Sequence, residues 1–295
     1  LEINNWLDVF ILLPIILLGL HRLLTGKGQI IYYVALTCLF VQNYYFGYMT
    51  AIFLIIWTLV QLSRLKGQKL KRFVNFTLVS ILSALSSLFM LLPTYLDLKT
   101  HGETFTNIVN LKTEDSWYLD FFAKNLVGSF DTTKFGSIPM ISVGLVPLIL
   151  ALLFFTLKSI KPIVKLSYSL FFTLIISSFY LQPLNLFWQG MHAPNMFLYR
   201  YAWVLSIGII YLAAETVVRL DQINLKHFTL VISFLFIGFL STYFFKNHYD
   251  FLVDVNFLLT LEFLIAYFIL FIAILGYKSS YKWITSTIVI FSLLE

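Results

Sequence analysis

Charged residues are scarce in this chain. Only 12% of its 295 residues are charged, whereas 60% are hydrophobic and 18% are aromatic. An average soluble domain is about 25% charged, so a chain of this composition has too few polar side chains to cover its surface in water. The scarcity excludes a soluble globular protein and a disordered chain, and it leaves a polytopic membrane protein.

Cysteine is almost absent as well. Cys38 is the single one and lies in an apolar run, which excludes a disulfide within the chain and a cysteine-based metal site. The HExxH and GxSxG motifs of metalloproteases and serine hydrolases are also missing. The sequence therefore contains no recognisable metal site. It does not identify a cofactor, and a role for a divalent cation stays open.

Ten apolar runs are candidates for membrane segments, since about 20 apolar residues cross the hydrocarbon core. They are residues 8–22, 30–42, 44–62, 73–95, 138–157, 166–182, 198–218, 228–245, 256–276 and 283–294. We therefore expect an all-α, polytopic transmembrane helical bundle of about nine to ten membrane segments. Residues 1–295 would form a single membrane domain, in which the short run 30–42 either crosses the membrane or re-enters it. Because the chain starts with Leu1 rather than Met, we interpret it as an internal piece of a longer polypeptide.

The charges predict an orientation. Most of the 20 basic residues lie in the connections 21–28, 63–73, 158–165, 219–227 and 277–282, and most acidic residues lie in the other connections. Lys and Arg mark cytoplasmic loops, so the net charge of +6 gives no reason to expect a nucleic-acid partner. The remaining connections, above all the long polar stretch 97–137, are predicted to be extracytoplasmic.

The outer connection 182–201 holds the densest cluster of polar side chains among aromatic ones. Arg200 is the only Arg expected outside, and a guanidinium can bind a lipid phosphate in bidentate fashion. The alternative is an interfacial anchor within an aromatic belt that includes Tyr199. His192 suits a general base, a phosphate partner or a metal ligand, or it is a solvated loop residue, and Asn195 lies in the same Gly- and Pro-containing loop.

Four further outer residues are candidates, each with a structural alternative. Asn43 and Tyr44 form the tip of a tight turn and line a cavity or anchor the turn at the interface. Asp8 begins the first segment, where a carboxylate faces a cavity or caps the helix. Asp131 precedes a later segment and orients a sugar hydroxyl or stabilises a turn.

Two carboxylates fall within the apolar runs. Intramembrane acids are candidates for functional residues. Glu215 can pair with Arg219, four residues on, which favours a structural role. Glu262 has no obvious partner, and its role stays open.

A series of motifs follows in order along the chain: residues 7–14, 43–49, 92–94, 128–131 and, above all, the stretch from Gly190 to Tyr201. These motifs resemble those of the bacterial YfhO family of membrane proteins. The resemblance extends over roughly residues 7–210, in order along the chain. In the last motif Met196 and Leu198 stand where the family usually has Gly and Pro, so we expect a different loop backbone there.

The resemblance implies a fold like that of type-C glycosyltransferases, in a bacterial plasma membrane with the active face outside. Such enzymes take a sugar from a polyprenyl-phosphate carrier, and members of the family are linked to glycosylation of teichoic acids such as lipoteichoic acid. The implied partners are membrane lipid, the lipid-linked sugar and an envelope polymer as acceptor. The alternative is a transporter, a flippase or an assembly factor for lipid-linked envelope precursors.

The resemblance also implies roles for individual residues. The catalytic acid of such folds lies in the first large outer loop, which would precede Leu1, and Asp8 is a weak candidate within this chain. The residues implied to line the carrier and phosphate site are Arg200, His192, Asn195, Tyr199, Asn43, Tyr44 and Asp131.

Overall fold

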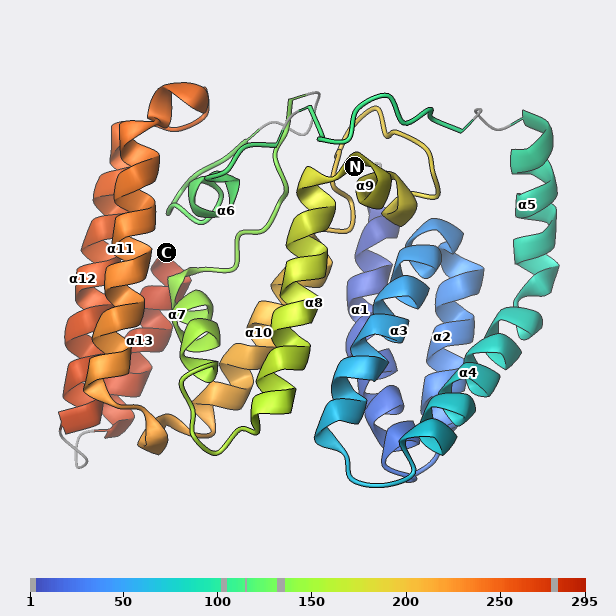
Figure 1. Cartoon of the computed structure of the whole chain (residues 1–295), viewed down its shortest axis with the longest axis horizontal. Helices are drawn as coiled ribbons and strands as arrows, with labels where there is room; N and C mark the ends of the chain where they lie inside the picture. The colour runs from blue at the N-terminus through green and yellow to red at the C-terminus, as the bar shows by residue number, and fades with distance from the viewer. Residues whose placement is uncertain (1–3, 102–104, 115, 132–135, 277–280) are drawn as a thin grey trace. The chain divides into compact units, whose positions relative to one another are not determined.

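The computed structural model describes residues 4–101, 105–114, 116–131, 136–276 and 281–295 (Figure 1). It confirms the predicted all-α class: over these residues the chain forms α-helices and short 3-10 turns, and the only β pairing is an isolated bridge between Lys112 and Leu181. Contacts divide the chain into two compact units. Unit 1 comprises residues 1–107, 166–171 and 186–192, and unit 2 comprises residues 108–165, 172–185 and 193–295. That residues 1–295 form a single membrane domain stays a prediction.

Five helices belong to unit 1 and six to unit 2 among the residues described, and two helices are shared. Unit 1 holds α1 (Asn4–Leu24), α2 (Ile30–Gln42), α3 (Tyr44–Arg64), α4 (Lys69–Ser86) and α5 (Leu88–His101). Unit 2 holds α6 (Asp120–Ala123), α7 (Leu145–Phe154), α10 (Trp203–Val217), α11 (Leu225–Phe244), α12 (Asp254–Gly276) and α13 (Tyr281–Leu294). Both units contribute to α8 (Pro162–Tyr180) and α9 (Gln182–Trp188).

Fewer helices are long enough to cross a membrane than the nine to ten predicted. Within the described residues, four helices qualify by length and composition, namely α3, α8, α11 and α12. A fifth span would be the pair α4 and α5, which is bent by 72°. Each predicted apolar run does contain a helix, but several helices are short. For example, α7 has 10 residues and a length of about 15 Å, because residues 137–144 form no helix.

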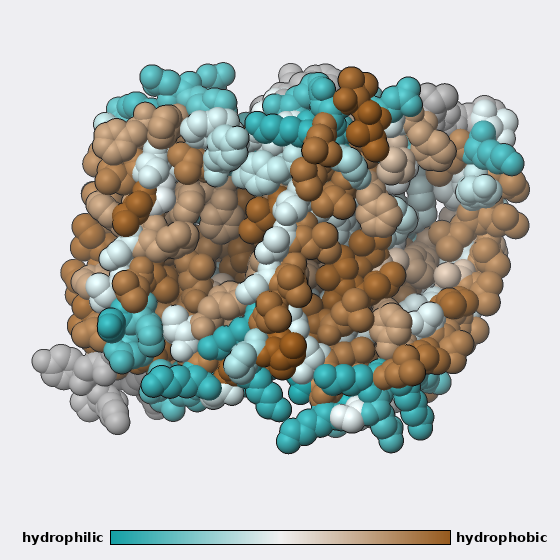
Figure 2. Space-filling model, viewed as in Figure 1, coloured by the Kyte–Doolittle hydropathy of each residue, from teal (hydrophilic) through white to brown (hydrophobic). Residues whose placement is uncertain are grey.

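Apolar side chains cover the sides of the helices and polar side chains gather at their ends (Figure 2). Large apolar residues such as Leu78, Leu170 and Ile237 are more than half exposed. Lipid is the solvent that tolerates such surfaces, because contiguous apolar patches of this extent are rare on soluble monomers. The chain is therefore a helical membrane protein.

Helix packing in unit 1 combines a close glycine contact with hydroxyl pairs. Gly19 of α1 lies against the backbone of Tyr32 in α2. On the other side of α2, the Tyr32 hydroxyl pairs with Ser80 at 2.8 Å, and the Tyr33 hydroxyl pairs with Ser86 at 2.7 Å. Small residues and interhelical hydroxyl contacts are the means by which helices associate in lipid, so these residues fix α2 between α1 and α4.

In unit 2, the segment 117–131 is docked on α11 and α12 rather than loose. The ring of Phe122 lies over Gly238 of α11, where a side chain would collide with it. Val127 donates its amide to the Thr260 hydroxyl at 2.8 Å and accepts from the Asn256 amide at 3.0 Å. The middle of the predicted extracytoplasmic stretch 97–137 is therefore a folded element with a buried interior.

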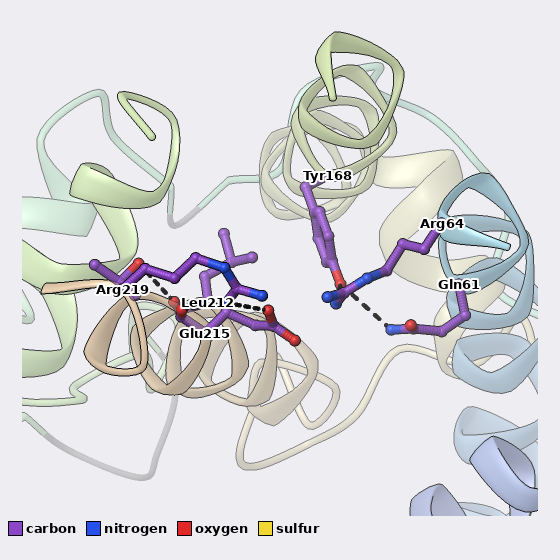
Figure 3. A network of polar contacts seen from close by, with 7 residues as sticks. Gln61, Arg64, Tyr168, Leu212, Glu215 and Arg219 are labelled. Atoms are coloured by element: carbon purple, nitrogen blue, oxygen red, sulfur yellow. Dashed lines mark hydrogen bonds and ion pairs between the residues drawn. The ribbon is translucent and has the colours of Figure 1, made fainter. Parts of the chain in front are cut away.

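Two polar contacts lie at helix ends that are predicted from the charge distribution to be cytoplasmic (Figure 3). In unit 1, Gln61 and Arg64 of α3 each donate to the Tyr168 hydroxyl of α8 at 3.3 Å. In unit 2, Arg219 donates to the Glu215 carboxylate at 2.7 Å. The predicted pairing of Glu215 with Arg219 is confirmed.

Candidate functional site

The predicted outer end of unit 1 is built around the turn between α2 and α3. Asn43 is the N-cap of α3, and its side-chain oxygen accepts the Phe46 amide at 3.0 Å. Tyr44 begins the helix and is exposed. One turn later, the Tyr48 hydroxyl donates to the carbonyl of Phe187 at 2.7 Å. The turn is therefore tied to the end of α9.

His192 lies in the same unit, in the loop that follows α9. Its ring is half-buried, with its centroid 5.3 Å from that of Phe105. Its neighbour Met191 accepts the Thr106 amide at 2.9 Å and has a φ of +65°, a region that costs free energy for a residue with a side chain. Asn43, Tyr44 and His192 thus all belong to unit 1, and the Tyr48 hydroxyl ties their turn to α9, the helix that precedes His192. Asp8 lies in α1, and its side chain falls outside the described part of the chain.

Arg200, Asn195 and Tyr199 belong to unit 2. The Arg200 side chain is half-buried, and its Nε and Nη2 donate to the Met196 carbonyl at 3.3 and 3.1 Å. Asn195 is exposed. Phe197, between them, has a φ of +52°, so this loop holds a second strained residue besides Met191.

Aromatic side chains attach this loop to the C-terminal end of α8. The ring of Tyr199 packs edge-on against Phe179 at 5.8 Å, and the ring of Tyr201 stacks on Phe179 at 5.4 Å. The buried Tyr201 hydroxyl donates to the Ser178 carbonyl at 2.7 Å. Arg200 is thereby fixed between two tyrosines that are both anchored on α8.

A groove of about 570 Å³ opens in unit 2 at this same end of α8. Its lining residues are Leu111, Lys112, Tyr118, Phe121, Ile176, Tyr180 and Leu181, so it is apolar with one cation. We call it the Lys112 groove. The bridge between Lys112 and Leu181 closes one side, and the Lys112 ammonium lies 5.5 Å from the ring centroid of Tyr118. A cation at the edge of an apolar groove suits an amphiphile with an anionic head.

Behind the groove lies a buried carboxylate, Asp120. It is 2% exposed, and it accepts the Trp117 amide at 2.7 Å and the Tyr249 hydroxyl at 2.9 Å. Burial raises the pKa of Asp120 to about 6, although these two hydrogen bonds and the nearby His248 and Lys112 favour the carboxylate. The Trp117 carbonyl in turn accepts the Tyr180 hydroxyl at 3.0 Å. One residue, Trp117, therefore connects Asp120 with the wall of the groove.

A second buried charge lies on the same short element. Lys124 is paired with Asp131 at 3.2 Å, and Asp131 also accepts the Ile138 amide at 3.0 Å. Burial lowers the pKa of Lys124, and the charge of Asp131 opposes that shift. The carboxylate of Asp131 is thus engaged within the protein interior.

The sequence interpretation did not select Lys112, Asp120 or Lys124. The sequence placed them only in the long polar stretch 97–137, and no local motif set them apart from its other charged residues. Among the residues that the structure describes, no group of three or more His, Cys, Asp or Glu side chains gathers as metal ligands do.

Comparison with known protein families identifies the chain's family. The model of a family described as bacterial membrane protein YfhO matches residues 1–295. No curated protein and no solved structure matches the chain significantly.

Proposed function

The chain belongs to the YfhO family of bacterial membrane proteins, and on that premise we propose that its full-length protein is a membrane glycosyltransferase. It transfers a sugar from a polyprenyl-phosphate carrier to a cell-envelope polymer such as teichoic acid on the outer face of the membrane. The observation that carries this proposal is the Lys112 groove, an apolar groove with one cation at the end of a membrane-spanning helix.

The groove matches the two chemical parts of such a carrier. A polyprenyl phosphate keeps its hydrocarbon tail in lipid and its phosphate at the interface. The apolar lining from Leu111, Phe121 and Ile176 suits the first isoprene units, and the Lys112 ammonium suits the phosphate. Arg200, held on the same end of α8 by Tyr199 and Tyr201, supplies a second cation.

These two cations act on the leaving group. In the transfer, the acceptor hydroxyl oxygen forms a bond to the anomeric carbon of the sugar while the bond from that carbon to the phosphate oxygen breaks. The electron pair stays on the phosphate, and the hydroxyl proton passes to a carboxylate base. Lys112 and Arg200 stabilise the charge that develops on the departing phosphate. We place the base in an outer loop upstream of Leu1, with Asp8 as the weaker candidate within this chain.

The test uses the full-length protein in a strain from which its gene has been deleted. The sugar content of purified teichoic acid is measured in the deletion strain and after complementation with wild type, Arg200→Ala or Lys112→Ala. Lys99→Ala is the matched control, because Lys99 is an exposed lysine at the outer end of α5. We expect the sugar to be lost in the deletion strain and reduced at least about tenfold in both cation variants at equal membrane levels, with no change in the control.

Three results would contradict the proposal. Unchanged sugar in the deletion strain would exclude this acceptor. Full activity of both cation variants would show that Arg200 and Lys112 do not act on the phosphate and serve only as interfacial anchors. If the lipid-linked sugar accumulated on the inner leaflet of the deletion strain, the defect would lie in transport, and the flippase alternative would be favoured.

A further inference from the structure

Glu262 is a carboxylate near the middle of the most apolar membrane helix. It is exposed on α12, three residues from the helix midpoint at Ile265, which is a distance of about 4.5 Å along the axis. Within the described part of the chain, no hydrogen bond or ion pair engages it. This carboxylate is independent of the Lys112 groove and of the proposed sugar transfer.

An acidic side chain at this depth needs a partner. A charged or strongly polar group at the centre of a membrane helix is costly, and such groups normally face a protein interior and pair there. The outer end of α12 at Asp254 is eight residues away, or about 12 Å. Lys and Arg reach the headgroups by snorkelling because their side chains are long. Glutamate has a shorter side chain, so the Glu262 carboxylate cannot reach the interface in that way.

The surface around Glu262 has the form of a helix-docking face. Leu258, Ile265 and Ile269 share its side of α12 and are 60%, 50% and 60% exposed. Beside them a groove of about 450 Å³ runs between α11 and α12, which lie side by side in Figure 1. Ile265 belongs to both the exposed stripe and the groove, whose other walls include Ser233 and Phe236 of α11. Grooves between helices receive the ridges of a third helix.

We propose that this face of α12 binds a partner transmembrane helix that carries a Lys or Arg near its centre. The cation pairs with Glu262, and neighbouring apolar side chains of the partner fill the groove. An acyl chain supplies no donor at this depth, which disfavours lipid as the occupant. A second copy of the chain does not meet the requirement either, because every Lys and Arg in the sequence lies at an end of an apolar run or in a connection.

The test measures recognition of the cation in a bilayer. The full-length protein, labelled with a fluorescent donor, is reconstituted with an acceptor-labelled leucine-based helix of about 20 residues that has either Lys or Leu at its centre. Energy transfer gives the two affinities. We expect the Lys helix to bind roughly threefold to thirtyfold more tightly, the range of interhelical polar contacts in membranes.

Variants assign the preference to one side chain. Glu262→Gln and Glu262→Leu should abolish the difference between the two helices. Leu258→Ala, an apolar change on the same stripe, should keep it. Equal affinities for the Lys and Leu helices with wild type would overturn the proposal, as would a preference that persists in Glu262→Gln. If the protein associates with itself and Glu262→Gln abolishes that association, the occupant of this face is a second copy of the chain, and the proposal is wrong.

Discussion

The Lys124 ammonium lies 3.2 Å from the Asp131 carboxylate, and only 3% and 6% of these side chains are exposed. The pair joins the end of α6 to the segment before α7, since Asp131 also holds the Ile138 amide. A buried ion pair adds little net stability, but removing one partner leaves a charge without compensation. The ion pair of Lys124 and Asp131 therefore helps to hold the segment 117–131, which carries Asp120, in place.

We predict that Lys124→Met destabilises the protein by about 3–5 kcal/mol, the cost of an uncompensated buried charge. The double variant Lys124→Met with Asp131→Asn should recover at least half of that loss, because the amide is neutral and can still accept from Ile138. Thermal unfolding in detergent measures both. Lys99→Met is the control at an exposed position. A loss below about 1 kcal/mol in the single variant would show that water reaches Asp131.

Asp120 should make stability fall as pH rises. Its pKa in the folded protein is about 6 against an ordinary 3.8, so the folded state holds a proton that the unfolded state has released. The stability that this pKa shift contributes is fully present below about pH 4, and it is lost as the pH rises through 6. The loss approaches about 1–3 kcal/mol at neutral pH. Because other carboxylates titrate in the same range, the informative quantity is the difference between wild type and Asp120→Asn.

The experiment records thermal unfolding from pH 4 to pH 8 for both proteins. Asp120→Asn should be no less stable than wild type at pH 8 and should have the flatter profile. Tyr249→Phe removes a donor to the carboxylate, so it should steepen the profile instead. Parallel curves for wild type and Asp120→Asn would mean that Asp120 is solvated in the folded protein.

The helices of the apolar runs were predictable from the sequence, whereas the short helices α6 and α9 and the crossing of the membrane were not. Hydrophobic runs alone place a helix in every predicted segment, and α2 has the predicted bounds 30–42. The apolar run 73–95 is continuous and does not predict the bend between α4 and α5, which occurs at Ser87. The Ser87 hydroxyl accordingly bonds the carbonyl of Thr37 in α2, a tertiary contact that hydropathy does not encode.

The candidate site, too, was predictable from the sequence only in part. The pair of Glu215 and Arg219 follows from helical spacing and was predicted. Asp120 meets Tyr249, which is 129 residues away, and the Lys112 groove combines residues 111–121 with residues 176–181. Contacts over such separations depend on how the folded segment 117–131 docks onto α11 and α12, and no local pattern reveals that docking.

Gly19 offers a test of the packing that fixes unit 1. A Cβ atom at this position would lie 2.5 Å from the Tyr32 nitrogen and 2.6 Å from its Cα. Both atoms are backbone, so no rotamer change relieves the collision, and α1 and α2 must separate. Tyr32 is fully buried and hydrogen-bonded to Ser80, which ties the shift to α4 as well.

We therefore expect Gly19→Ala to lower the stability of the protein by about 1–3 kcal/mol, as overpacking does in well-packed interiors, and Gly19→Leu to prevent accumulation of folded protein. Thermal unfolding in detergent gives the size of the effect. Leu18→Ala, at a neighbouring position that is 55% exposed, should change stability by less than about 1 kcal/mol. Equal effects of the two alanine variants would mean that α1 and α2 are not in backbone contact, and that the hydroxyl pairs with α4 hold α2 without α1.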